Sequence, residues 1–196
     1  MLAGFVFLIA NLPAFQAPAT EADFVPMKIG STWTYKIEGK NDRFIITANK
    51  AEKVGEQDCV VFEGKINGKL VASEHIALMK DGAYRFQYDR KALTPPICYF
   101  RANYGKGEAW NQVYTFDGSK ILIKYKVDIE DVTVPAGKFK DAHIIRAEAN
   151  ETVGENVEVN KSSIWYVKGV GMVKQVVVTG DIRILIELEK FEEPKQ

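Results

Sequence analysis

Pairs of turn-forming residues divide this chain into short strand-like segments, and this punctuation constrains the fold more than any other feature. The pairs are Asn67-Gly68, Asp81-Gly82, Asp117-Gly118 and Gly180-Asp181. Such pairs favour the left-handed backbone dihedrals of tight hairpin turns. Each pair separates two segments rich in β-branched and aromatic residues, so the sequence predicts a largely antiparallel sheet built from hairpins.

The segment 32–38 shows the expected strand pattern most clearly. Trp33, Tyr35 and Ile37 alternate with polar residues, which is the period of two of a strand with one buried face. In no part of the sequence do apolar residues recur at the helical spacing of three or four positions more clearly than they alternate with polar residues. Strands are predicted over residues 32–38, 43–48, 58–66, 70–78, 83–88, 110–116, 121–129, 142–147, 163–167, 172–179 and 182–191.

Two further segments bear on the organisation of the sheet. The spacing Gly-x-x-Trp occurs at Gly30 to Trp33 and again at Gly107 to Trp110. It predicts two strands that begin in comparable positions, with both tryptophans largely buried. The proline-bearing stretch 89–106 has no strong strand signal, so it is expected to be irregular, either a connection between two halves or a mobile flap.

These patterns predict an all-β or mainly β fold, a strongly curved antiparallel sheet with an open-barrel or clamshell-like shape. Hydrophobic residues make up 46% and charged residues 27% of the 196 residues, which is ordinary globular usage. The chain can therefore bury a core without metals or many disulfides. We expect a signal peptide over residues 1–20 and a single β-rich domain over residues 21–196.

The N-terminal residues 2–15 are almost entirely apolar, and the first charged residue is Glu21. This stretch is too short to span a membrane but fits the apolar region of a secretory signal peptide. Small residues that could supply a cleavage site follow at Ala17, Ala19 and Ala22. The mature protein is expected to begin between residues 17 and 23, to lack a transmembrane segment and to be periplasmic or secreted. The alternative is a buried N-terminal strand or helix.

Charge and motif content exclude several function classes. Lys plus Arg and Asp plus Glu number 26 each, without segregation, so nothing indicates the basic face that nucleic-acid binding requires. His75 and His143 have no second ligand at a spacing typical of metal sites, and no Gly-x-Ser-x-Gly elbow occurs. We expect no metal, no cofactor and no catalytic residues, hence a protein that is not an enzyme. An unrecognised hydrolase is the less favoured alternative.

Cys59 and Cys98 form a possible disulfide, because an exported protein folds in an oxidising compartment. Cys59 also lies in an apolar run where a free buried thiol is equally natural. The sequence leaves both alternatives open.

Aromatic residues gather in the stretch 89–106 at Tyr99, Phe100 and Tyr104. Rings beside a curved sheet either close the end of the core or line the mouth of an apolar cavity. On the second interpretation, these three residues are the expected ligand contacts.

Several longer blocks carry a resemblance to known proteins. They are Phe24 to Tyr35, Lys80 to Tyr84, Glu130 to Phe139 and Trp165 to Lys174. Together they resemble a diffuse set of uncharacterised exported bacterial β-rich proteins and lipoproteins. The resemblance implies a curved antiparallel sheet akin to the open barrel of the periplasmic lipoprotein carriers, and it implies no established reaction.

The favoured hypothesis is therefore a non-enzymatic binding module for a lipid or another apolar ligand. The alternative is a structural or protein-interaction module of the cell envelope, whose exposed sheet edge pairs with a partner strand. A continuous internal cavity would favour the first, and a filled core with a long free edge the second.

Overall fold

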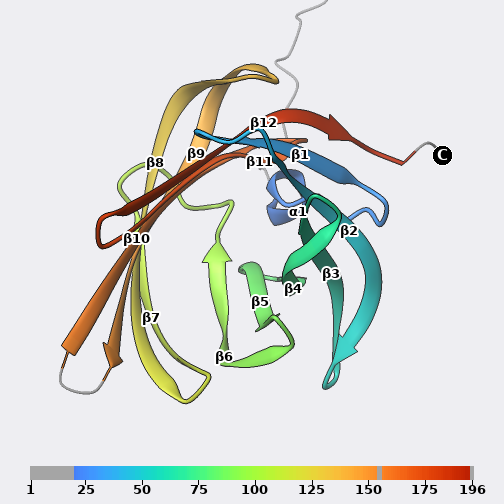
Figure 1. The fold of residues 1–196 in the computed structure, drawn as a ribbon. Coiled ribbons are helices and arrows are strands. Elements are labelled where there is room, and N and C mark those ends of the chain that lie inside the picture. The colour runs from blue at the N-terminus through green and yellow to red at the C-terminus, as the bar shows by residue number, and fades with distance from the viewer. Residues whose placement is uncertain (1–19, 154–155, 195–196) are drawn as a thin grey trace, which may run out of the picture.

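The computed structural model describes residues 20–153 and 156–194, in which twelve antiparallel strands form one closed barrel (Figure 1). A single helical turn, α1 (Glu21–Phe24), precedes them. The strands are β1 (Thr32–Ile37), β2 (Arg43–Val54), β3 (Gln57–Ile66), β4 (Lys69–Met79), β5 (Gly82–Tyr88), β6 (Lys91–Phe100), β7 (Ala109–Phe116), β8 (Ser119–Val134), β9 (Gly137–Val153), β10 (Asn156–Val167), β11 (Gly171–Thr179) and β12 (Ile182–Glu192). The predicted all-β fold, built from hairpins, is confirmed.

The two junctions that close the barrel differ in strength. Strands β1 and β12 pair over six residue pairs, from Thr32 with Glu192 to Ile37 with Ile186. Strands β6 and β7 pair only at Thr94 and Thr115. We call this second junction the β6/β7 seam. The barrel is closed rather than open as expected, but the β6/β7 seam holds it shut with very little backbone pairing.

The expectation of an irregular segment over residues 89–106 is wrong for its central part, which forms β6. Pro95 and Pro96 obscured the strand, because a proline has no N–H to donate to a ladder and is confined to strand edges and bulges. Their place beside the β6/β7 seam suits this restriction, since little pairing occurs there. The side chains of Leu93, Ile97 and Tyr99 are buried, and their packing in the core holds the strand in place where backbone pairing is sparse.

The repeated Gly-x-x-Trp spacing opens two strands in the same way, as predicted. Gly30 and Gly107 have φ angles of 92° and 91°, a region that favours glycine. The Gly30 N–H donates to the Ala48 carbonyl at 2.7 Å, and the Gly107 N–H donates to the Val127 carbonyl at 2.9 Å. Strands β1 and β7 therefore begin at comparable turns, each fixed to the strand that follows it.

The two tryptophans of this repeat are alike in bonding but not in burial. The indole N–H of Trp33 donates to the Val170 carbonyl, and that of Trp110 donates to the Cys98 carbonyl. The prediction that both tryptophans are largely buried is confirmed for Trp33, whereas Trp110 is only partly buried, at the margin of the core. Trp110 lies on β7, where the poorly paired β6/β7 seam leaves one flank open.

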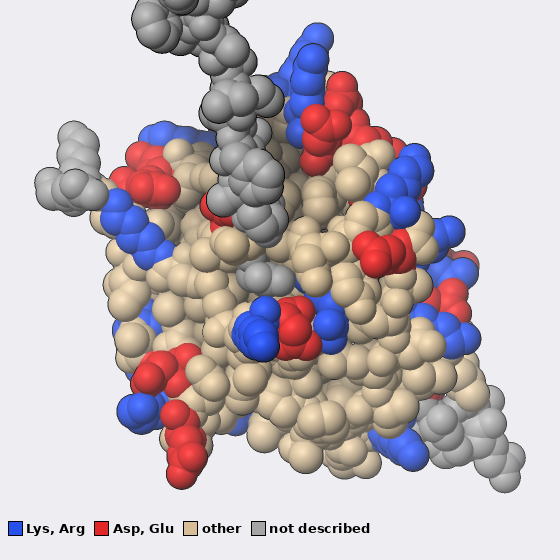
Figure 2. Space-filling view, turned by 180° about the vertical axis from the view of Figure 1, so that it is seen from behind, with Lys and Arg blue, Asp and Glu red and all other residues tan. Residues whose placement is uncertain are grey.

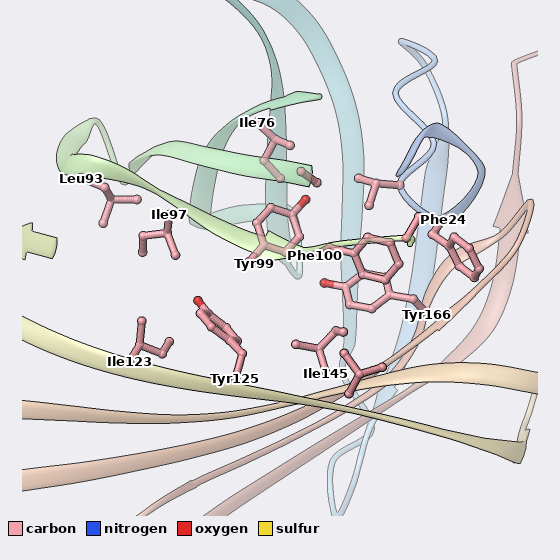
Figure 3. Close-up of a cluster of buried hydrophobic side chains, with 14 residues drawn as sticks. Phe24, Ile76, Leu93, Ile97, Tyr99, Phe100, Ile123, Tyr125, Ile145 and Tyr166 are labelled. Atoms are coloured by element: carbon pink, nitrogen blue, oxygen red, sulfur yellow. The ribbon is translucent and has the colours of Figure 1, made fainter. Parts of the chain in front are cut away.

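Two clusters of buried side chains fill much of the barrel. One contains Trp33 and Leu188. The other contains Tyr99, Phe100 and Tyr166 and includes Phe24 from α1 (Figure 3). The sequence offered no amphipathic helix to fill the concave side of the sheet, yet this single turn inserts a ring there.

The cysteines do not form the possible disulfide. Cys59 and Cys98 are free and buried, so the alternative of buried thiols holds. Cys59 lies on β3 and Cys98 on β6, with two strands between them in the wall. Three strand spacings amount to about 14 Å along the wall, well beyond the reach of a disulfide. Burial raises the pKa of both thiols, which disfavours reactive thiolates.

The outer surface carries both signs of charge side by side, without a large single-sign region on the face shown in Figure 2. The described residues contain no helix that is both long and apolar enough to span a membrane. Residues 1–19, which hold most of the predicted signal peptide, lie outside the described residues. The predicted start of the mature chain stays a prediction.

Candidate functional site

A cavity of about 330 Å³ lies within the barrel and is partly open to solvent, and its volume is in the size range of small-molecule sites. Strands β1 to β6, β10 and β11 contribute to its wall, together with the residues around α1. Both clusters of buried side chains reach it, through Trp33 from one and Tyr99 from the other. The cavity is therefore the space that the two clusters leave between them.

Small residues on β3 and β4 help to keep this space open. Gly64 pairs with Ala72, and both line the cavity. A Cβ atom on Gly64 would lie only 2.5 Å from Cε2 of Phe44, so glycine is what lets this ring lie flat against the strand. Larger residues at these positions would fill the cavity or displace its wall.

A charged pair interrupts the mainly apolar lining. Nε and Nη2 of Arg85 lie 3.0 Å and 2.9 Å from Oε2 of Glu74, and both residues line the cavity. The guanidinium carbon of Arg85 lies 5.3 Å from the ring centroid of Tyr99 and 6.0 Å from that of Tyr88. The guanidinium thus lies between a carboxylate and the faces of two aromatic rings.

Burial and charge fix the protonation of these groups. Burial alone lowers the pKa of Arg85, but the Glu74 carboxylate reverses this effect and the pKa is raised. Burial raises the pKa of Tyr99 and Tyr166 well above the ordinary value of a phenol, although Arg85 opposes the rise. The site therefore presents a permanent cation and phenols that keep their protons.

Only one of the three predicted ligand contacts lines the cavity. Tyr99 does so, whereas Phe100 packs beside it, with its ring centroid 5.2 Å from that of Phe24 and 4.8 Å from that of Tyr166. Tyr104 lies in the loop before β7 and packs edge-on against Trp110, away from the cavity. The aromatic group 99–104 is thus divided between the cavity, the core and a surface loop.

Arg85 was not predicted from the sequence, because a β-bulge hides the alternation of β5. His75 pairs with Gln87 and Ile76 with Arg85, so Phe86 has no partner on β4. This extra residue shifts the alternation and allows both Arg85 and Tyr88 to reach the cavity. Glu74 did carry a usable signal, since it is the one carboxylate in β4.

Polar groups elsewhere in the protein, including His75, have structural surroundings. Nε2 of His75 lies 3.6 Å from Oε1 of Glu52, and Glu130 accepts a hydrogen bond from the indole N–H of Trp165 at 3.0 Å. Lys106 and Arg146 flank Asp128. In the part of the chain that the structure describes, no group of three or more His, Cys, Asp or Glu side chains could hold a metal ion.

His143 yields a prediction about pH. Its ring lies 4.6 Å from that of Phe24, and burial lowers its pKa, against a smaller opposing effect of Asp141. Below pH ~6.5, the usual histidine value, the unfolded chain binds the proton more readily than the folded chain. The contribution of His143 to the free energy of unfolding is therefore expected to be fully present above this pH and to be lost as the pH decreases below it.

Urea unfolding of wild type and His143→Gln between pH 8 and pH 5 measures this effect. The variant is expected to lose less stability than wild type over that interval. An equal loss in both proteins would show that His143 makes no contribution.

The sequence matches no family model and no curated protein. Three solved structures are similar to the chain. One is a protein from Bacteroides fragilis considered to be exported, with a YmcC-like fold (14% identity, 87% of this chain and 99% of that chain, TM-score 0.46). The second is considered to be a lipoprotein of Parabacteroides distasonis (13% identity, 87% of this chain and 99% of that chain, TM-score 0.48). The third is the hypothetical lipoprotein YmcC of Escherichia coli (12% identity, 84% of this chain and 85% of that chain, TM-score 0.40).

Proposed function

We propose that this protein is an exported, non-enzymatic binding module that holds an apolar or amphiphilic small molecule inside its barrel. The observation that carries the proposal is the internal cavity of about 330 Å³, lined mainly by aromatic and aliphatic side chains. The apolar stretch over residues 2–15 supports export.

The packing around the cavity supports this interpretation. Protein interiors are normally packed as densely as organic crystals. A mainly apolar space that the side chains of the barrel leave unfilled is suited to an apolar ligand, which gains contacts with its wall.

The alternative of an envelope interaction module rests on a different feature. A closed barrel removes most free sheet edges, but the β6/β7 seam leaves backbone groups of two strands without ladder partners. A partner strand could pair there. The internal cavity has no role in that function, and for this reason we favour ligand binding.

Filling the cavity tests the proposal. Ala72 lines the cavity, and Ala72→Leu adds three carbon atoms that point into it. We expect this variant to bind a fluorescent fatty-acid analogue about tenfold more weakly than delipidated wild type, because an extra methylene in a fitted pocket already changes affinity by about this much. Fluorescence titration measures both affinities.

The matched control is Ala51→Leu, at an exposed position of β2, which is expected to bind like wild type. Far-UV circular dichroism checks that both variants are folded. Absence of saturable binding to delipidated wild type, or equal affinity in Ala72→Leu, would contradict the proposed function.

A further inference from the structure

The Arg85–Glu74 ion pair is a feature of the cavity that an apolar ligand does not explain. Both side chains are about one-quarter exposed, and an ion pair of this kind contributes little to stability, so folding alone does not require it. Both side chains line the cavity rather than the packed core. Their position indicates that they act on what the cavity holds, and this step rests on the proposed function.

The pair leaves part of the guanidinium available. Both close contacts of Arg85, from Nε and Nη2, end on the same oxygen of Glu74. A guanidinium has five N–H donors. Within residues 20–153 and 156–194, no group accepts a hydrogen bond from Nη1 of Arg85. Glu74 therefore orients the guanidinium and leaves its Nη1 donors free.

Two phenols add further donors. Tyr99 and Tyr166 line the cavity, with ring centroids 6.5 Å apart (Figure 3). Among the described residues, neither hydroxyl has a hydrogen-bond partner, unlike that of Tyr35, which donates to the Met172 carbonyl at 2.8 Å. Both phenols keep their protons because burial raises their pKa. The polar part of the cavity thus combines the Arg85–Glu74 ion pair, which leaves Nη1 donors of Arg85 free, with O–H groups that can donate.

We infer that the ligand is an amphiphile with an anionic head group, a carboxylate or a phosphate monoester. The head group accepts hydrogen bonds from Arg85 and from the phenols of Tyr99 and Tyr166. Hydrogen bonds between ionised partners are about twice as strong as neutral ones, and anionic oxygens match a set of donors. The apolar chain packs against the aromatic part of the wall, which includes Trp33 and Phe44.

Competition between ligands that share a chain tests the head group. Dodecanoate, dodecyl phosphate and dodecan-1-ol each displace a fluorescent fatty-acid analogue from the delipidated full chain at pH 8. We expect at least one anion to bind ten- to a hundredfold more tightly than the alcohol, the effect of one charged hydrogen bond. The tighter of the two anions identifies the head group.

Two variants test whether Arg85 and Glu74 determine the preference for the anions over the alcohol. Glu74→Gln/Arg85→Met removes both charges together, so that neither is left unpaired, and is expected to lose most of the preference for the anions, because only the neutral phenol donors remain. Glu74→Gln alone releases the whole guanidinium and is expected to bind the anions several-fold more tightly than wild type. The matched control is Arg43→Met/Glu189→Gln, which removes a partly exposed ion pair outside the cavity and is expected to keep the preference.

The outcomes distinguish the head-group assignment from the binding function. Equal binding of anions and alcohol by wild type, a preference that is undiminished in Glu74→Gln/Arg85→Met, or failure of both anions to displace the bound analogue would overturn the head-group assignment and leave the binding function standing. Failure of the analogue to bind at all would overturn both.

Discussion

Replacement of Phe100 by alanine is expected to lower the free energy of unfolding by about 3–5 kcal/mol, the usual range for removal of a buried phenylalanine ring. Phe100 is fully buried and packs against Phe24, Tyr166 and His143. Its ring therefore joins α1 to the wall of the barrel. Phe100 does not line the cavity. Under conditions in which Phe100→Ala is folded, this variant is therefore expected to bind the fluorescent fatty-acid analogue with the affinity of wild type.

Urea unfolding with and without the analogue measures both quantities, and Tyr104→Ala is the control. Tyr104 is half-buried in a loop, so its loss is expected to reduce stability by about 1 kcal/mol. A Phe100→Ala protein with wild-type stability and weakened binding would reverse this assignment. It would make Phe100 the ligand contact that the sequence suggested.

A single methyl group at Gly82 is expected to destabilise the fold by about 3 kcal/mol, the upper part of the range for overpacking. A Cβ atom there would lie 2.4 Å from Sγ of Cys98 and 2.8 Å from the Phe100 carbonyl oxygen. The thiol can move, but the carbonyl belongs to the backbone of β6. Strands β5 and β6 must therefore separate to accommodate Gly82→Ala.

A double-mutant cycle tests this explanation. Cys98→Ala removes the closest atom, so Gly82→Ala is expected to be less damaging in that background but still harmful because the carbonyl contact remains. Gly105→Ala is the control, since its new Cβ would meet only the Glu108 carboxylate, at 3.6 Å. Equal losses of stability in Gly82→Ala and Gly105→Ala would contradict the steric explanation.

The sequence predicted most of this fold because its strands obey simple rules. Alternation identified β1, and pairs such as Asn67-Gly68 marked the hairpins. Strand β6 was not predicted, because Pro95 and Pro96 are residues more typical of a loop than of a strand. Closure of the barrel was not predictable either, since it depends on the pairing of the first strand with the last. Local patterns carry no information about such a distant contact.

The candidate site was less predictable than the fold. Tyr99 was predicted to be a ligand contact from its aromatic side chain, and it does line the cavity. Phe100 and Tyr104 were predicted together with it only because they are close to it in the sequence. Arg85 looked like an ordinary charged strand residue, because the bulge at Phe86 cannot be seen without the register of β4. The cavity itself arises from contacts among strands distant in the chain, together with the ring of Phe24.

The unequal backbone pairing at the two junctions of the barrel means that different contacts hold them closed. Separation of β6 from β7 breaks one backbone pairing, Thr94 with Thr115, and the hydrogen bond from the Trp110 indole to the Cys98 carbonyl, whereas separation of β1 from β12 breaks six pairings. Side-chain packing rather than backbone pairing therefore holds the β6/β7 seam closed, through the β6 residues Leu93, Ile97, Tyr99 and Phe100 of the buried cluster. Tyr99 also lines the cavity, so the contacts that close the barrel at this seam and the contacts that shape the cavity meet in one ring.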